Sequence, residues 1–129
     1  MQNNNKKVLI IEDDPFIADV YILKLESEGY SVETAEDGAK GLEKLKNKKY
    51  DVILLDIIMP NMDGFEVLER IKMAPELSKI PVIILTNLSQ KKDIKKGIDL
   101  GAADYIVKTK FTPSEVVKTI NKVLGEKER

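Results

Sequence analysis

Short apolar runs and stretches with helical periodicity alternate five times along this chain. The runs cover Val8–Ile11, Ser31–Ala35, Val52–Leu55, Val82–Leu85 and Tyr105–Val107. Runs of this length predict strands, and apolar strands separated by helices are typical of a parallel sheet covered on both faces. Right-handed crossovers then leave few topologies. With 129 residues, the chain is predicted to form a single α/β domain.

The segments between the runs carry apolar residues at the spacing of a helix face. These residues are Ile17, Val20, Tyr21, Leu23 and Leu25 in the first segment, Ala39, Leu42 and Leu45 in the second, Phe65, Val67, Leu68 and Ile71 in the third, and Val116, Val117, Ile120 and Leu124 in the last. Gly29 and Gly101 are predicted to end the first and fourth helices. Thr112, followed by Pro113 and Glu115, predicts a capping box at the start of the last helix.

Histidine and cysteine are absent from the sequence. This excludes Ser-His-Asp and Cys-His catalytic groups, imidazole and thiolate zinc sites, disulfide bonds and a phosphohistidine on this chain. The 21 Lys+Arg and 22 Asp+Glu residues give a net charge of −1, which attracts neither nucleic acid nor an anionic membrane. No apolar run approaches the ~20 residues of a membrane span, and the first residues lack the apolar core of a signal peptide. We therefore expect a cytoplasmic protein that neither inserts into a membrane nor binds nucleic acid directly.

Acidic residues directly follow two of the predicted strands. Glu12 and Asp13 come after the first strand, and Asp56 comes after the third. Ligands of such sheets bind outside the carboxyl ends of the strands, so these carboxylates are expected at one site. Their mutual repulsion calls for a cation, and Mg²⁺ takes one or two carboxylates and leaves room for phosphate oxygens. Thr86 and Lys108 end the fourth and fifth strands and would add a hydroxyl and an ammonium group. We interpret Asp56 as a nucleophile that forms an acyl phosphate.

Each of these residues also has an ordinary structural explanation when taken alone. Asp14 before Pro15 is expected to cap the next helix, which is also the plain explanation of its acidic neighbours. By itself, Thr86 is a hydroxyl at a strand end, Tyr105 is a half-buried strand aromatic and Lys108 is a solvated strand end. The functional interpretation depends on all of them lying at, or next to, the carboxyl ends of strands.

The motifs around these residues resemble the receiver domain of bacterial response regulators, the CheY-like superfamily. They are Ile10-Ile11-Glu12-Asp13-Asp14, Leu54-Leu55-Asp56-Ile57-Ile58-Met59-Pro60-Asn61-Met62-Asp63-Gly64, Leu85-Thr86 and Val107-Lys108. The likeness runs from Lys7 to Leu124 in order and at family spacing. The resemblance implies a flavodoxin-like, doubly wound fold of five βα units, with a parallel sheet in the strand order 2-1-3-4-5.

The resemblance also implies a role for each site residue. Asp56 would accept a phosphoryl group from a sensor histidine kinase or a phosphotransfer protein. Asp13, Asp56 and the backbone carbonyl of Ile58 would bind Mg²⁺. Glu12 would assist them, and Lys108 would pair with the phosphoryl group.

Thr86 and Tyr105 match the switch pair of the family. By resemblance, Thr86 would turn toward the phosphoryl oxygen and Tyr105 would move inward into the space it leaves. This would change the surface of the fourth helix, fifth strand and fifth helix, where effector proteins dock. The basic run 91–96 would lie on this surface, or would be a solvated helix face. Two residues depart from the family, because Thr109 replaces a proline after the lysine and Asn87 replaces a small residue after the threonine.

The sequence therefore predicts a single-domain response regulator of a two-component system. Residues 7–125 would form the receiver domain, after a disordered leader at 1–6 and before a polar tail at 126–129. It would catalyse only its own phosphorylation and dephosphorylation. Its output would pass through an effector protein, unless the chain is cut from a longer one.

Three other functions are compatible with parts of the pattern. A receiver-shaped interaction module would keep the fold without being controlled by phosphorylation. A Mg²⁺-dependent phosphatase resembling the haloacid dehalogenases would also use an aspartyl nucleophile, but Ile58 stands where such enzymes have a second acid. A flavin-binding protein would need a hydroxyl- and glycine-rich loop after the first strand, where this chain has acids.

Overall fold

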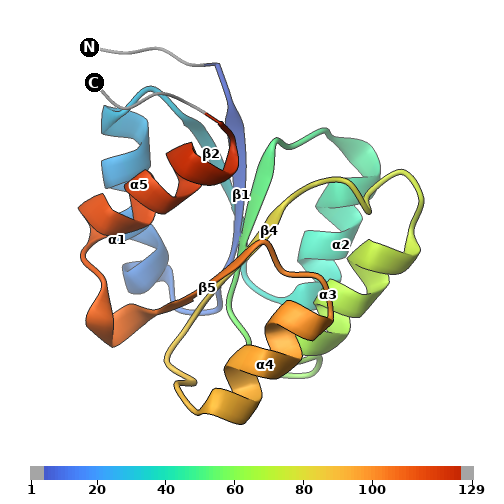
Figure 1. Ribbon diagram of the computed structural model, residues 1–129. Coiled ribbons are helices and arrows are strands. Elements are labelled where there is room, and N and C mark those ends of the chain that lie inside the picture. The colour runs from blue at the N-terminus through green and yellow to red at the C-terminus, as the bar shows by residue number, and fades with distance from the viewer. Residues whose placement is uncertain (1–4, 126–129) are drawn as a thin grey trace.

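The computed structural model describes residues 5–125 and shows a parallel sheet between two layers of helices (Figure 1). The elements are β1 (Lys7–Ile11), α1 (Pro15–Ser27), β2 (Ser31–Ala35), α2 (Gly38–Asn47), β3 (Val52–Leu55), α3 (Gly64–Met73), β4 (Val82–Thr86), α4 (Lys91–Asp99), β5 (Asp104–Val107), a 3₁₀ turn η1 (Lys108–Lys110) and α5 (Pro113–Val123). The five strands are parallel and lie in the order β2-β1-β3-β4-β5. This confirms the predicted fold class and strand order.

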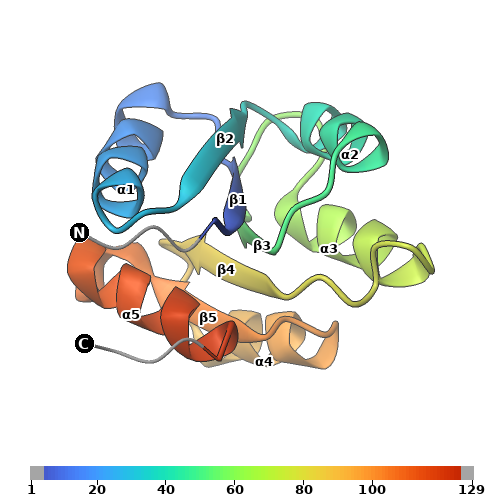
Figure 2. The same ribbon diagram turned by 90° about the horizontal axis from the view of Figure 1, so that it is seen from above.

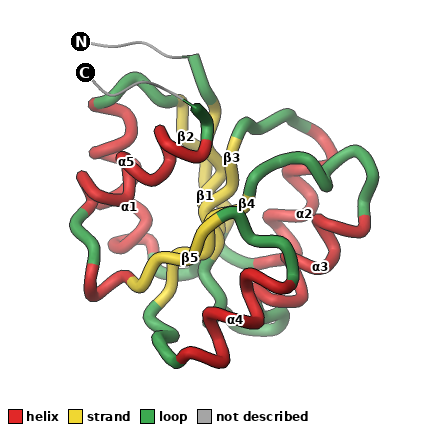
Figure 3. The backbone as a smooth tube through the Cα atoms, viewed as in Figure 1, coloured by secondary structure: helices red, strands yellow, loops and turns green. Residues whose placement is uncertain are grey.

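The sheet separates two apolar cores (Figure 2). Helices α1 and α5 cover one face, and α2, α3 and α4 cover the other. Successive strand residues point to opposite faces, so Val8 and Ile10 pack under α1 and α5 while Leu9 and Ile11 pack under α2 and α3. Figure 3 shows the strands gathered at the centre, with the helices outside them. Among the described residues, none of the helices combines the length and apolar character needed to cross a bilayer.

The predicted helix ends are confirmed. Asp14 caps α1 by accepting hydrogen bonds from the backbone of Phe16 and Ile17. Thr112 and Glu115 form the predicted capping box at α5. After α1 and α4 the chain turns at Gly29 and Gly101, whose φ angles of +94° and +106° favour glycine.

The predicted apolar face of α1 is partly wrong. Val20 and Leu23 are 49% and 71% exposed, and the buried residues are Ala18, Tyr21 and Leu25. At 3.6 residues per turn, positions 20 and 23 lie on the side opposite to 18, 21 and 25, so the apolar residues of this helix occupy two sides. Only contact with the sheet decides which side is buried.

The face of α2 also differs from the prediction. Ala39 is exposed, whereas Gly38, Gly41 and Leu45 are buried. A side chain at Gly41 would place its Cβ 2.5 Å from Cδ1 of Ile11. The helix backbone therefore approaches the sheet at Gly41, and glycine carries no apolar signal in the sequence.

The predicted leader and tail fall largely outside the described residues. Residues 1–4 and 126–129 are not described, and residues 5 and 6 precede β1. The predicted domain boundaries therefore remain predictions.

Candidate functional site

Three carboxylates meet at the carboxyl edge of the sheet. Glu12 and Asp56 directly follow the neighbouring strands β1 and β3. Sheet pairing continues to both residues, because the Glu12 amide donates to the Ala35 carbonyl and the Asp56 amide to the Ile11 carbonyl, each at 3.0 Å. One carboxylate oxygen each from Glu12, Asp13 and Asp56 lie within 4.8 Å of one another. Glu12 and Asp56 are only 6% exposed, while Asp13 is open to solvent.

Lys108 brings a cation to this cluster from the end of β5. Its Nζ donates to Oε1 of Glu12 at 2.5 Å and to Oδ2 of Asp56 at 2.9 Å, and its side chain is 9% exposed. Burial lowers the pKa of Lys108, but the hydrogen bonds to the two carboxylates outweigh burial and raise that pKa. Burial raises the pKa of Glu12, and the hydrogen bond from Lys108 opposes this effect. The result is an ammonium held between two buried acids.

The loop after β3 is folded tightly around Asp56. The amide of Ile58 donates to Oδ1 of Asp56 at 3.2 Å, and the amide of Gly64 donates to the Ile57 carbonyl at 2.9 Å. A Cβ on Gly64 would lie 2.2 Å from the backbone oxygen of Asp56, so only glycine fits at this position. Both oxygens of the Asp56 carboxylate are thereby held, one by Ile58 and the other by Lys108.

Thr86 and Tyr105 are joined through the backbone of Leu88. Thr86 ends β4 and is fully buried, and its hydroxyl accepts a hydrogen bond from the Leu88 amide at 3.5 Å. The Tyr105 hydroxyl donates to the Leu88 carbonyl at 2.8 Å. Burial raises the pKa of Tyr105 to about 12, so this phenol stays a donor at neutral pH. No sequence signal marked Leu88, because its contribution is made entirely by backbone atoms.

The two departures from the family pattern lie beside these groups. Asn87 is exposed and follows Thr86, and Thr109 is exposed within η1. All peptide bonds within residues 5–125 are trans, including the one after Lys108. Two carboxylates hold the Lys108 side chain in place, so its position at the site does not require the proline.

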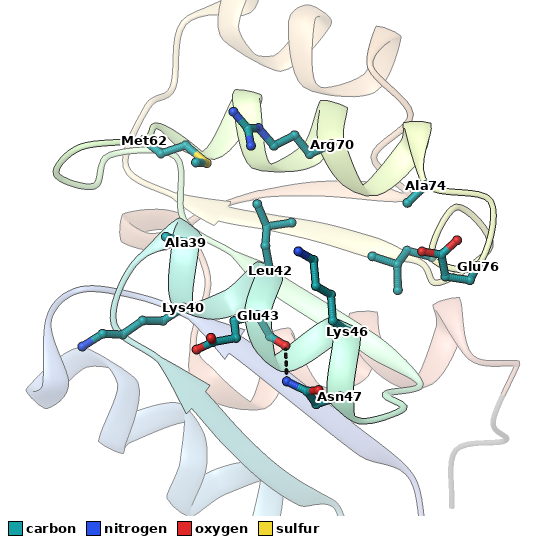
Figure 4. Close-up of a pocket in the computed structure, with 11 residues that line it drawn as sticks. Ala39, Lys40, Leu42, Glu43, Lys46, Asn47, Met62, Arg70, Ala74 and Glu76 are labelled. Atoms are coloured by element: carbon teal, nitrogen blue, oxygen red, sulfur yellow. Dashed lines mark hydrogen bonds between the residues drawn. The ribbon is translucent and has the colours of Figure 1, made fainter.

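A hollow away from these residues lies between α2 and α3 (Figure 4). It measures about 610 Å³, and Lys40, Lys46 and Arg70 are among the residues that line it. None of the candidate site residues lines it. A smaller hollow of about 220 Å³ opens beside Glu12 and Asp13. The converging charged groups therefore identify the candidate site better than cavity size does.

The chain resembles known proteins along almost its whole length. A model of the response regulator receiver domain family matches residues 8–121. The chain is 38% identical over 123 residues to the DNA-binding dual master transcriptional regulator RpaA of Synechocystis sp., a match covering 95% of the chain and 51% of that protein. It is 41% identical over 118 residues to the response regulator ArlR of Staphylococcus saprophyticus, covering 92% of the chain and 52% of that protein. The chain thus spans about half the length of these two curated relatives.

Solved structures resemble the whole fold. The chemotaxis protein CheY4 of Vibrio cholerae matches with a TM-score of 0.86 and 34% identity, covering 92% of this chain and 98% of that one. A putative response regulator of Chloroflexus aurantiacus matches with a TM-score of 0.89 and 28% identity, covering 95% and 100%.

Proposed function

We propose that this chain, a member of the response regulator receiver domain family, is a phosphorylation-controlled switch. In this proposal it accepts a phosphoryl group on Asp56. The observation that carries the proposal is the bridge from the Lys108 ammonium to Asp56 and Glu12, at 2.9 and 2.5 Å. This bridge supports the proposal, because Asp56 as the nucleophile would have a charge-neutralising cation beside it at the carboxyl edge of the sheet.

The chemistry needs an ionised Asp56 carboxylate, one oxygen of which can reach the phosphorus atom, and positive charge close to it. An oxygen of the Asp56 carboxylate attacks phosphorus, and a P–O bond forms as the P–N bond to the donor imidazole breaks. The imidazole leaves with the bonding electron pair and takes up a proton from solvent. Lys108 then pairs with an oxygen of the new phosphoryl group, and the Ile58 amide keeps the carboxylate oriented.

The acid cluster fits a divalent cation by its chemistry. Three carboxylates supply hard oxygen donors within 4.8 Å of one another, and exposed Asp13 keeps one side open to water. Asp13, Asp56 and the Ile58 carbonyl would hold Mg²⁺, with Glu12 assisting. The ion would neutralise negative charge on the carboxylate and the phosphoryl oxygens.

The signal would leave the site through Thr86 and Tyr105. When the Thr86 hydroxyl turns to a phosphoryl oxygen, it loses its hydrogen bond from the Leu88 amide. The carbonyl of the same residue accepts the hydrogen bond from the Tyr105 hydroxyl. This couples a local charge to the α4-β5-α5 surface, where we place the effector protein. A sensor histidine kinase or a phosphotransfer protein would be the donor. The protein would turn over no external substrate.

The test is phosphorylation by acetyl phosphate with and without Mg²⁺, followed by intact mass. The expected result is a mass gain of one phosphoryl group that requires Mg²⁺ and is removed by hydroxylamine, since an acyl phosphate is a reactive anhydride. A phosphate that is independent of Mg²⁺, or that is linked to serine, would contradict the proposal. Absence of any phosphoryl transfer would favour the interaction-module alternative.

Mg²⁺ is expected to stabilise the folded protein, because it binds the assembled cluster and not the unfolded chain. At 100 times the dissociation constant the gain would be about 2.7 kcal/mol. Thermal unfolding monitored by circular dichroism should show a rise of several degrees, and Asp13→Asn should remove it. Asp14→Asn is the matched control, because asparagine keeps the helix cap. An equal rise in Asp13→Asn would exclude Asp13 as a ligand.

A further inference from the structure

Helix α4 buries a single residue, which is a glycine. Of its nine residues, all of them described, Gly97 alone is buried. A Cβ on Gly97 would lie 2.6 Å from Cδ1 of Ile84, 3.0 Å from Cδ2 of Tyr105 and 3.2 Å from Cε2 of Tyr105. The backbone of α4 therefore lies directly against the ring of Tyr105.

The glycine is unfavourable for the helix itself. Glycine inside a helix is less favourable than alanine, and Gln90 provides no side-chain hydrogen bond at the start of α4. Helix stability therefore does not explain why position 97 is a glycine. The close approach of the helix backbone to Ile84 and Tyr105 explains it.

Of the two neighbours, Tyr105 has the greater freedom to move. Ile84 is fully buried in the core on the α3 side of the sheet, so its side chain has no open space to enter. Tyr105 is half-buried on the edge strand β5 and is held at its far end by the hydrogen bond to Leu88. A side chain at position 97 would therefore press on the Tyr105 ring, which would have to move away from α4 by a few tenths of an ångström and so disturb the hydrogen bond from its hydroxyl to the Leu88 carbonyl.

We infer that Gly97 is a positioning residue, because the lack of a side chain at this position lets the Tyr105 hydroxyl reach the Leu88 carbonyl. A side chain at position 97 would displace the ring and uncouple Tyr105 from Thr86. Asp56 would still accept a phosphoryl group. This inference rests on the proposed function, because it concerns how phosphorylation reaches the α4-β5-α5 surface. Gly97 contacts neither the carboxylates nor Lys108, so the acceptor chemistry does not depend on it.

Fluorine NMR of the full chain labelled with 3-fluorotyrosine tests the inference. The chain has four tyrosines, and Tyr105→Phe assigns the signal of Tyr105. Before phosphorylation, Gly97→Ala should shift the Tyr105 signal and leave the other three unchanged. After treatment with acetyl phosphate and Mg²⁺, wild type and Gly97→Ala should gain the same phosphoryl mass. The Tyr105 signal should move in wild type and stay fixed in Gly97→Ala.

Gly41→Ala is the matched control. It is also a buried glycine inside a helix, and its Cβ would crowd Cδ1 of an isoleucine, Ile11, at 2.5 Å without touching an aromatic ring. This variant should keep the Tyr105 response. An unshifted Tyr105 signal in Gly97→Ala, or a full response after phosphorylation, would overturn the inference.

A second variant separates the two neighbours of Gly97. Adding Ile84→Val to Gly97→Ala removes the Ile84 methyl group that the new Cβ would meet but leaves the contact with the ring. The Tyr105 signal should stay displaced. Its return to the wild-type position would show that Gly97 positions Ile84 and not Tyr105, which would overturn the inference.

If Gly97→Ala does not fold, adding Tyr105→Ala should restore folding, and failure to do so would also overturn the inference. Lack of phosphorylation in wild type would instead refute the proposed function, because the shift in the unphosphorylated protein is independent of it.

Discussion

Lys108→Ala should lose about 3–5 kcal/mol of folding free energy and accept a phosphoryl group ~10²–10³-fold more slowly. The stability loss follows because Glu12 and Asp56 are both 6% exposed and would be left without their cation. The rate loss follows because no ammonium would then neutralise the transferring phosphoryl group. Urea unfolding at neutral pH measures the first effect, and the time course of acetyl phosphate labelling with Mg²⁺ measures the second.

Lys110→Ala is the control for this variant. Lys110 lies in the same 3₁₀ turn, is exposed, and has no carboxylate partner among the described residues. Its removal should change stability by less than ~0.5 kcal/mol and leave the labelling rate unchanged. A Lys108→Ala protein labelled at the wild-type rate would remove Lys108 from the proposed chemistry.

Asp56→Asn should abolish phosphoryl acceptance, because an amide oxygen is a poor nucleophile and cannot form a stable acyl phosphate. The protein should still fold, since the amide group keeps an acceptor for the Ile58 amide and reduces the charge buried beside Glu12. Intact mass after treatment with acetyl phosphate and Mg²⁺ measures the loss.

Asp63→Asn is the matched control for Asp56→Asn. Asp63 belongs to the same loop but is exposed and caps α3 through the Glu66 amide at 3.0 Å, a role that asparagine fills equally well. Labelling of Asp63→Asn should equal that of wild type. Residual Mg²⁺-dependent labelling of Asp56→Asn would mean that another carboxylate accepts the phosphoryl group.

The sheet and the place where the acidic residues of the candidate site converge could be predicted, because both follow from the pattern of apolar runs and the residues that end them. Continuous apolar runs mark strands buried on both faces, and parallel pairing brings their carboxyl ends to one edge. The positions of Glu12 and Asp56 follow from these two facts alone. The structure places them on adjacent strands, with both backbone amides in the extended pairing.

Features that depend on tertiary packing could not be predicted in the same way. The side of α1 that faces the sheet was misassigned at Val20 and Leu23, because this helix has apolar residues on both sides. Lys108 is held by Glu12 and Asp56, two carboxylates that are far from it in the sequence, so the absence of a proline at Thr109 gave no indication of this contact. Thr86 and Tyr105 are linked through backbone atoms of Leu88, which every residue type possesses, so the identity of residue 88 does not predict the link.

The most direct test of the central claim is to locate the phosphoryl group at residue level. Borohydride reduces an acyl phosphate to an alcohol with release of phosphate, so a phosphorylated aspartate becomes homoserine. After treatment with acetyl phosphate and Mg²⁺, reduction and peptide mass mapping should find homoserine at position 56 and at no other aspartate. Without Mg²⁺ it should be absent. Homoserine at Asp13 or Asp63, or a phosphorylated protein that yields none, would contradict the account.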